Sequence, residues 1–280
     1  SGNETTLQIA PLDVASMLGP VLVENRTAIL TSATLPQATA AAVGLEEDEH
    51  DRIDVDSPFD YPNNALLYCA KHLPEPRSPE YERAMLTHMV ELMSSAGGRT
   101  LGLFTSYRMM DAAAEFLETY IKTPILTQRD YPKPVLIEKF KEDPATSLLA
   151  TLGFWQGIDI PGPSLSLVTI DRLPFPRPDD PLLSARRDLA GRHAFKLIDL
   201  PRASTLLAQG AGRLIRSKSD QGVVAVLDSR LSTKKSYRWD LINALPDFTR
   251  TSDPEVAMER LRTIAAVGAS GTDASALDDA

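Results

Sequence analysis

The residue types that could do chemistry are concentrated in one stretch, Gln209-Gly210-Ala211-Gly212-Arg213-Leu214-Ile215-Arg216. Arg213 and Arg216 are three apart, so a helix over this stretch would place both on one face. A guanidinium stays charged and offers a rigid fork of donors, which suits the charge on a transferring phosphoryl group. Gly210 and Gly212 each cost a helix about 1 kcal/mol relative to Ala, which indicates a close approach to the backbone. A solvated basic helix end is the plainer alternative, but Gln209 and the two glycines at fixed offsets favour phosphate chemistry.

A second stretch, Gly153-Phe154-Trp155-Gln156-Gly157-Ile158-Asp159, follows an apolar strand predicted at 147–151. Glycine-rich loops at the carboxyl ends of strands are where open α/β sheets bind ligands. Asp159 could accept a hydrogen bond from a ribose hydroxyl or orient an arginine, and Trp155 could stack on a ligand or pack in the core. The alternatives are a turn aspartate and a core tryptophan, and core packing is favoured for Trp155.

Two loops carry clustered hydroxyl groups. Thr31-Ser32-Ala33-Thr34 follows an apolar run at 27–30 that predicts a buried strand, although capping of the next helix, at 37–43, is the simpler role for these hydroxyls. Thr105-Ser106-Tyr107 follows a strand predicted at 99–104 and precedes an amphipathic helix at 109–120.

The remaining pattern alternates short apolar runs with helical periodicity. Alternation of this kind predicts an α/β fold with a mostly parallel sheet covered by helices on both faces. Besides those above, strands are predicted at 52–55, 66–69, 124–127, 165–171 and 222–227, and helices at 81–95, 134–141, 182–198, 237–244 and 254–266. Leu200-Pro201 is expected to break the helix before the arginine stretch, and the tail after residue 266 is expected to be mobile.

Composition places the chain among ordinary globular proteins, with 280 residues, 43% hydrophobic and 24% charged. A net charge of −9 argues against a general polyanion-binding surface, but acidic residues concentrate at 46–51 and in the tail, while 186–218 is locally basic. No signal peptide or long apolar run is present, so we expect a cytoplasmic protein. The single cysteine, Cys69, predicts a core residue, and no metal site is expected.

In order, the loops at 31–34, 104–107 and 153–159 and the stretch 209–216 resemble motifs III, IV, V and VI of superfamily 2 helicases. The similarity is strongest to the DinG-like branch of the XPD-type DNA helicases, which also carry patterns like Leu173-Pro174-Phe175 and Leu200-Pro201-Arg202-Ala203. It covers nearly everything from Ala10 to Pro246.

This resemblance implies a three-layer RecA-like carboxyl-terminal lobe at 25–250, between an opening segment at 1–24 and a short helix with a mobile tail at 251–280. It also implies four groups of site residues. They are the catalytic residues Gln209, Arg213 and Arg216; the nucleotide-binding residues Gly157, Asp159 and Gly212; the DNA-binding residues Ser106, Tyr107 and Trp155; and the coupling residues Thr31, Ser32 and Thr34.

The sequence has no G-x-x-x-x-G-K-[ST] phosphate loop, and Asp48-Glu49-His50 lies in an acidic run that predicts a solvated loop. By resemblance, the phosphate loop, the Mg²⁺ ligands and any iron–sulfur cluster belong to a first lobe. We therefore expect the second lobe of an ATP-dependent DNA helicase, of 5′ to 3′ polarity and a DNA repair or replication-conflict type. Its partners would be single-stranded DNA and the first lobe of the same protein, with no membrane, and this chain alone should not hydrolyse ATP.

Two rival hypotheses come from other classes. One is an ATP-independent regulatory module that binds single-stranded nucleic acid, and the other is an unrelated α/β enzyme that handles phosphate.

Overall fold

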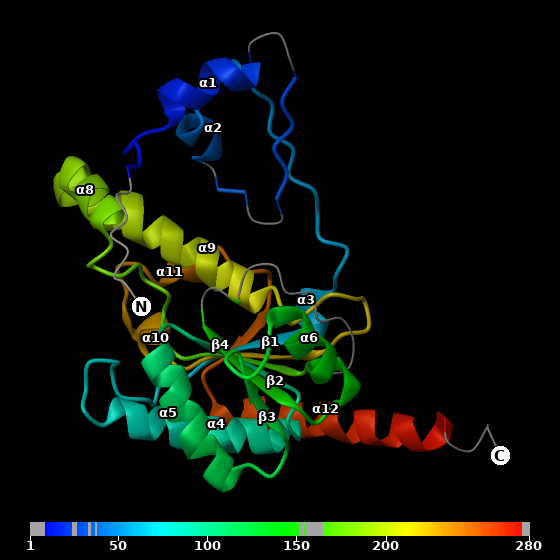
Figure 1. Ribbon diagram of the computed structural model, residues 1–280. Helices are drawn as coiled ribbons and strands as arrows, with labels where there is room; N and C mark the ends of the chain where they lie inside the picture. The colour runs from blue at the N-terminus through cyan, green and yellow to red at the C-terminus, as the bar shows by residue number, and fades with distance from the viewer. Residues whose placement is uncertain are drawn as a thin grey trace. The chain divides into compact units, whose positions relative to one another are not determined.

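The computed structural model describes residues 9–23, 27–32, 35–36, 38–151, 154 and 165–275, and Figure 1 shows their elements in chain order. The chain divides into two compact units. One unit is drawn from segments 1–56 and 175–205, and the other from segments 57–174 and 206–280.

The second unit is built on a seven-stranded parallel sheet with the order β3-β4-β2-β5-β6-β1-β7. Because all the strands are parallel, their carboxyl ends meet at one edge of the sheet and their amino ends at the other. The strands are β1 (Ala65–Cys69), β2 (Thr100–Phe104), β3 (Ile125–Thr127), β4 (Ser147–Thr151), β5 (Leu167–Ile170), β6 (Gly222–Val226) and β7 (Thr249–Thr251).

Three helices cover one face of this sheet: α4 (Tyr81–Ala96), α5 (Tyr107–Tyr120) and α12 (Pro254–Ser275). Their apolar stripes and the alternate strand residues on this face form one buried cluster, which includes Tyr68, Met85, Met89, Phe104 and Leu261. The five strands between the two edge strands are buried on both faces, which is why they read as continuous apolar runs.

The opposite face carries α6 (Lys133–Glu142) and the last turns of α9 (Leu200–Ala211). The chain moves outward from β2 to β3 through α5 and back to β4 through α6, so right-handed crossovers put the two helices on opposite faces. The expected three-layer α/β architecture is confirmed. Three short helices, α3 (Tyr61–Asn64), α10 (Arg230–Thr233) and α11 (Arg238–Ile242), lie in its connections.

The first unit contains α1 (Ala15–Val23), α2 (Thr39–Ala42), α8 (Pro181–Ala190), the 3₁₀ helix η1 (Gly191–His193) and the π-helix η2 (Phe195–Asp199). Asp180 caps α8 by accepting a hydrogen bond from Leu183 N–H at 3.0 Å. A largely buried ion pair of 2.8 Å between Arg187 and Asp199 joins α8 to η2.

Two predicted strands in the first unit are wrong. Residues 27–30 and 52–55 are irregular, and Ile29, Ile53 and Val55 are 85%, 84% and 86% exposed. The apolar pattern is present, but a strand needs a neighbour to pair with, and no described residue pairs with either segment.

The helix boundaries around the arginine stretch also differ from prediction. Pro201 does not break the helix: the chain changes from the π-helix η2 to the α-helix α9 at Leu200, and this local change of helix type accommodates the proline. The helix ends at Ala211, so Arg213 and Arg216 follow it and do not share a helical face. At the other end of the chain, α12 continues past residue 266 to Ser275. The segmentation into 1–24, 25–250 and 251–280 stays a prediction.

Gly97 and Gly98 make the turn between α4 and β2. Gly97 is the left-handed cap of α4 (φ 66°), and a Cβ added there would meet nothing nearer than Ala265 Cβ at 4.0 Å. At Gly98 (φ 88°), an added Cβ would lie 1.8 Å from the carbonyl oxygen of Ala145. Only the second glycine is required by a close approach of another segment.

We therefore expect Gly98→Ala to destabilise the protein far more than Gly97→Ala. The change at Gly97 should cost about 1 kcal/mol for its left-handed backbone. The change at Gly98 should cost at least about 2 kcal/mol more, because backbone must move. Urea unfolding of the two variants measures the difference, and equal midpoints would contradict it.

Candidate functional site

The arginine pair lies in a turn between α9 and β6. Beyond Ala211 the chain continues with tight backbone hydrogen bonds, from Arg213 N–H to Gly210 C=O and from Leu214 N–H to Ala211 C=O, both 3.2 Å. Leu214 and Ile215 are 2% exposed, whereas Arg213 and Arg216 are half-buried. The buried side chains of Leu214 and Ile215 anchor the turn. The side chains of Arg213 and Arg216 therefore extend from a backbone that is held in place.

Asp220 fastens this turn. Its carboxylate accepts hydrogen bonds from Arg216 N–H (2.7 Å), Ser217 N–H (2.8 Å) and Ser217 Oγ–H (2.6 Å). Asn64, just before β1, donates its side-chain N–H to the carbonyl of Lys218 at 3.1 Å. Sequence reasoning did not single out Asp220, although a serine three residues before an aspartate is a known turn signal.

The residues before the arginines have separate roles. Gly210 lies inside α9 and does not interrupt it, which corrects the expectation from sequence. A Cβ on Gly212 would lie 3.1 Å from the carbonyl of Ala208, so the turn itself accounts for this glycine. The side-chain oxygen of Gln209 is buried and accepts no hydrogen bond from the described residues. A buried acceptor of this kind fits a water molecule or a ligand hydroxyl.

The loop after β2 carries Ser106 and Tyr107. Ser106 caps α5, since its Oγ accepts the N–H of Met109 at 3.2 Å. Tyr107 is 50% exposed, and the guanidinium of Arg129 lies 4.7 Å from its ring centre. Asp111 holds Arg129 through two hydrogen bonds of 3.0 and 3.1 Å. A helix amino terminus, an aromatic ring and a cation therefore gather on this loop.

Asp171, directly after β5, holds this loop in place. Its two carboxylate oxygens accept hydrogen bonds from the N–H (2.8 Å) and Oγ–H (3.1 Å) of Thr105. Asp171 is 1% exposed, and burial raises its pKa to about 7, although the bonds from Thr105 and the charge of Arg172 act in the opposite direction.

Asp228 lies at the carboxyl end of the neighbouring strand, β6. It follows β6, is fully buried and accepts the backbone N–H of Leu173 at 2.9 Å. Arg230 pairs with it through several hydrogen bonds, the shortest 2.6 Å. Both aspartates were missed as site residues, although an aspartate directly after an apolar strand was a readable signal.

The glycine-rich loop begins at the same edge of the sheet. Thr151, its last preceding strand residue, is the parallel neighbour of Phe104. The side-chain oxygen of Gln128 accepts hydrogen bonds from Thr151 N–H (2.6 Å) and Oγ–H (3.1 Å). Trp155, Gly157 and Asp159 themselves lie outside the described residues.

The sheet separates the two groups of predicted site residues. Arg213 and Arg216 precede the amino end of β6, while Ser106 and Tyr107 follow the carboxyl end of β2. Five strand residues rise about 3.3 Å each, so the groups are separated by on the order of 15 Å along the strands.

The coupling residues belong to the first unit. Thr31 and Ser32 lie in an exposed, irregular segment, and Thr34 lies outside the described residues. Their coupling role stays a prediction. The acidic run at 46–51 is exposed, as expected for a solvated loop.

Cys69 is buried, as predicted, and burial raises its pKa to about 11. Within the described part of the chain, no group of three or more His, Cys, Asp or Glu side chains could hold a metal ion. None of the described helices combines the length and apolarity that a membrane span requires.

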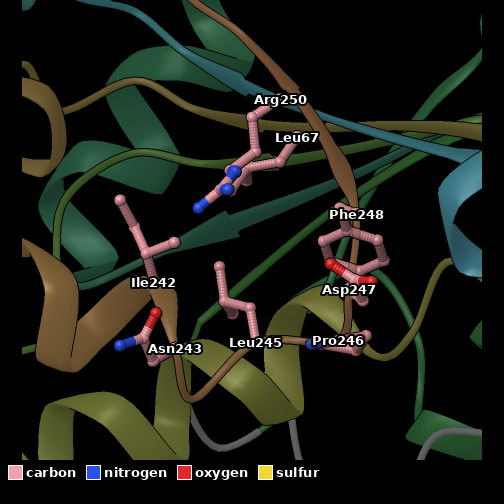
Figure 2. Close-up of a pocket in the computed structure, with 8 residues that line it drawn as sticks. All are labelled: Leu67, Ile242, Asn243, Leu245, Pro246, Asp247, Phe248 and Arg250. Carbon is pink, nitrogen blue, oxygen red and sulfur yellow. The ribbon is translucent and has the colours of Figure 1, made fainter.

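A cavity of about 390 Å³ lies between β1, β7 and the segment after α11. Figure 2 shows Arg250 reaching from β7 toward α11, where its guanidinium lies 5.6 Å from the ring centre of Trp239. None of the predicted site residues lines this cavity. It is lined by Leu67, Ile242, Asn243, Leu245, Pro246, Asp247, Phe248 and Arg250.

Comparison with known families decides the class of the chain. The helicase C-terminal domain family matches residues 89–248, more than half of the chain. The chain belongs to this family. Among curated relatives, the ATP-dependent helicase DinG of Mycobacterium tuberculosis is 48% identical over 269 residues, covering 92% of this chain and 40% of that protein. The ATP-dependent DNA helicase YoaA of Escherichia coli is 36% identical over 89% of this chain and 40% of its own length.

The resemblance to DinG-like helicases is thus confirmed, and this helicase C-terminal domain spans about two fifths of the length of these relatives. Solved structures show the same fold at low identity. S. tokodaii Xpd4 has a TM-score of 0.61 at 15% identity, covering 86% of this chain and 48% of that one. An XPD helicase has a TM-score of 0.54 at 19% identity, covering 67% and 35%. The RecA-like fold is confirmed.

We expect Asp220→Ala to loosen the arginine turn and lower stability by about 1 to 3 kcal/mol, because two backbone N–H groups and a hydroxyl lose their acceptor. Glu118→Ala, at an exposed carboxylate on α5, is the control and should change stability by less than about 0.5 kcal/mol. Urea unfolding measures both. An Asp220→Ala variant as stable as the control would show that the carboxylate does not hold the turn.

Proposed function

We propose that this chain is the second motor lobe of an ATP-dependent DNA helicase. In this proposal it supplies Arg213 and Arg216 to ATP bound by a first lobe and forms part of a groove for single-stranded DNA. The family resemblance adds 5′ to 3′ polarity and a role in DNA repair or at replication conflicts. The observation that carries the proposal is the fixed arginine turn at one edge of the sheet and the Ser106 loop at the other, in a chain 48% identical to a DinG helicase.

The residues present fit a nucleotide. Arg213 and Arg216 are half-buried and extend from the same turn, which Asp220 holds. The buried side-chain oxygen of Gln209 offers an acceptor to an attacking water. When bound, Mg²⁺ would neutralise charge on the phosphates, and the family resemblance assigns its ligands to the first lobe. Arg213 and Arg216 would stabilise charge that develops on the γ-phosphate, as forks that need no reorganisation.

Exposed apolar residues support a first lobe as partner. Ile29, Ile53 and Val55 carry strand-like patterns but stay almost fully exposed. Burial of a large aliphatic side chain is worth about 1.5 to 3 kcal/mol, so these segments would gain considerably from a sheet of another lobe. Thr31 and Ser32, next to one of these segments, would then lie where the two lobes meet and couple their movements.

The loop after β2 supports the nucleic-acid groove. The amino terminus of α5, a helix of 14 residues, offers backbone N–H groups to a phosphate, with Ser106 at the cap. Tyr107 offers an exposed ring for a base, and Arg129 beside it offers charge. Trp155 is assigned to the same groove by the family resemblance, as Gly157, Asp159 and Gly212 are to the nucleotide.

Closure of the two lobes on ATP would bring the arginines to the γ-phosphate, and hydrolysis would release them. Because the sheet is rigid, movement at the arginine edge would be transmitted to the loop edge. Repeated closure would then shift the bound strand in steps.

We expect this chain to bind single-stranded DNA weakly, without sequence preference, and with affinity that falls steeply as salt is added. The physical reason is that a groove of phosphate contacts releases counterions from the DNA. Fluorescence anisotropy with a labelled oligonucleotide at two salt concentrations measures this, with a duplex of the same sequence as control. Affinity that ignores salt, or duplex preferred over single strand, would reject the groove.

In the whole protein, Arg213→Ala or Arg216→Ala should lower kcat by about 10³- to 10⁵-fold while ATP affinity changes little, because the arginines act on transition-state charge. Lysine should rescue either position poorly, since an ammonium lacks the fork geometry. Gln209→Ala should be milder, because a neutral amide brings no charge. Steady-state ATPase with saturating single-stranded DNA and fluorescent-nucleotide binding give the two quantities.

This chain alone is the negative control, and we expect no ATP turnover from it because its sequence has no phosphate loop. Turnover by the pure chain that is lost in Arg213→Ala would contradict the two-lobe proposal. Near wild-type kcat in both arginine variants would show that Arg213 and Arg216 form a solvated basic segment and take no part in catalysis.

A further inference from the structure

We propose that Asp171 is a positioning residue for single-stranded DNA, acting through Thr105 on the loop that carries Ser106 and Tyr107. This inference rests on the proposed nucleic-acid groove. It adds a residue that directly follows a different strand, β5, and makes no DNA contact itself.

The geometry joins two neighbouring strands. The backbone N–H of Asp171 donates to the carbonyl of Leu103 at 3.0 Å, which continues the pairing of β5 with β2. The carboxylate then closes on the first residue beyond β2, accepting Thr105 N–H at 2.8 Å and Thr105 Oγ–H at 3.1 Å. One buried side chain therefore accepts both the backbone N–H and the hydroxyl hydrogen of Thr105.

The next residue is the one that would meet DNA. Thr105 is bonded directly to Ser106, whose Oγ caps α5. The direction of the Thr105 peptide sets where that cap and the first N–H groups of α5 point. A change in the hydrogen bonds of Asp171 therefore changes the placement of phosphate-binding groups without touching them.

Titratable and charged groups lie near Asp171 on neighbouring elements. From α4, Tyr81 donates its hydroxyl hydrogen to the carbonyl oxygen of Asp171, and Arg172 lies over the Tyr81 ring at 4.8 Å. Asp228 and its partner Arg230 lie at the end of the next strand, β6. Burial is the largest influence on the Asp171 pKa and raises it to about 7, so both protonation states are populated near neutral pH.

The two states hold Thr105 differently. The ionised carboxylate accepts from both the N–H and the hydroxyl of Thr105. The protonated form must place a hydrogen on one oxygen, so it can no longer accept both bonds in the same way. The loop is consequently held more firmly when Asp171 is ionised.

The experiment compares Asp171→Asn with wild type for single-stranded DNA binding between pH 5.5 and 8.5. Asn has a single acceptor oxygen, so at any pH it cannot accept the Thr105 N–H on one oxygen and the Thr105 hydroxyl on the other, as the carboxylate does. Asp130→Asn is the matched control, because the exposed Asp130 accepts the N–H (2.8 Å) and Oγ–H (3.0 Å) of Thr127, the last residue of β3, in the same pattern.

We expect Asp171→Asn to raise Kd by about 3- to 10-fold at pH 8.5, with a ratio that falls toward 1 at pH 5.5. The Asp130→Asn ratio should not vary with pH. A ratio for Asp171→Asn that is constant across the range, or equal to 1 throughout, overturns the inference. Loss of binding in wild type would instead reject the groove itself, and with it this inference.

Stability gives an independent reading. A carboxyl group whose pKa is raised on folding binds its proton more tightly in the folded state, so stability falls as pH rises between the unfolded pKa, about 3.9, and about 7. Wild type should therefore lose thermal stability relative to Asp171→Asn across that interval.

If Asp171→Asn does not fold, Thr105→Val replaces it in the binding experiment. This variant removes the hydrogen bond from the Thr105 hydroxyl and should flatten the pH dependence of DNA affinity. An unchanged pH profile in Thr105→Val overturns the inference.

Discussion

Two buried carboxylates fasten the loops at the carboxyl edge of the sheet, and the arrangement of that edge depends on them. Asp171 after β5 holds the loop after β2, and Asp228 after β6 holds the segment after β5. Each bond runs from one strand end to the next, so the loops form a connected series. Burying a carboxylate is costly unless hydrogen bonds satisfy it, and here backbone N–H groups of otherwise irregular segments do so. Burial nevertheless raises the pKa of Asp171 to about 7.

At the amino edge of the sheet, a carboxylate that is slightly more exposed, that of Asp220, also holds a turn by accepting hydrogen bonds. Asp220 holds the turn after α9 through two backbone N–H groups and a serine hydroxyl. The sheet therefore presents two prepared loops, one on each edge, with a close-packed core between them. Interiors of this density resist deformation, which allows a displacement at one edge to reach the other. A motor lobe in the proposed mechanism needs this property.

The first unit, by contrast, combines polar contacts with apolar side chains that stay exposed. The Arg187–Asp199 pair and the cap of α8 organise residues 175–205, but several strand-like apolar residues between 27 and 56 remain exposed. The segment combines a hydroxyl-rich loop with surface that water solvates poorly. Its arrangement is consistent with a surface completed by another lobe of the same protein in the proposed function.

The local sequence pattern by itself determined many of the strands of this protein and its family. Apolar runs such as Leu66–Cys69 and 222–227 predicted their strands because burial on both faces of a parallel sheet leaves no polar alternation, and four motifs in order predicted the family. Only tertiary structure decided the rest. Whether 27–30 becomes a strand depends on a neighbour, which a local pattern does not contain. The arginine stretch looked helical, but Asp220 and the buried Leu214 and Ile215 fix a turn there. Asp171 and Thr105 are far apart in the chain, and only the order of β2 beside β5 brings them together, because pairing between distant strands is set by packing of the whole sheet.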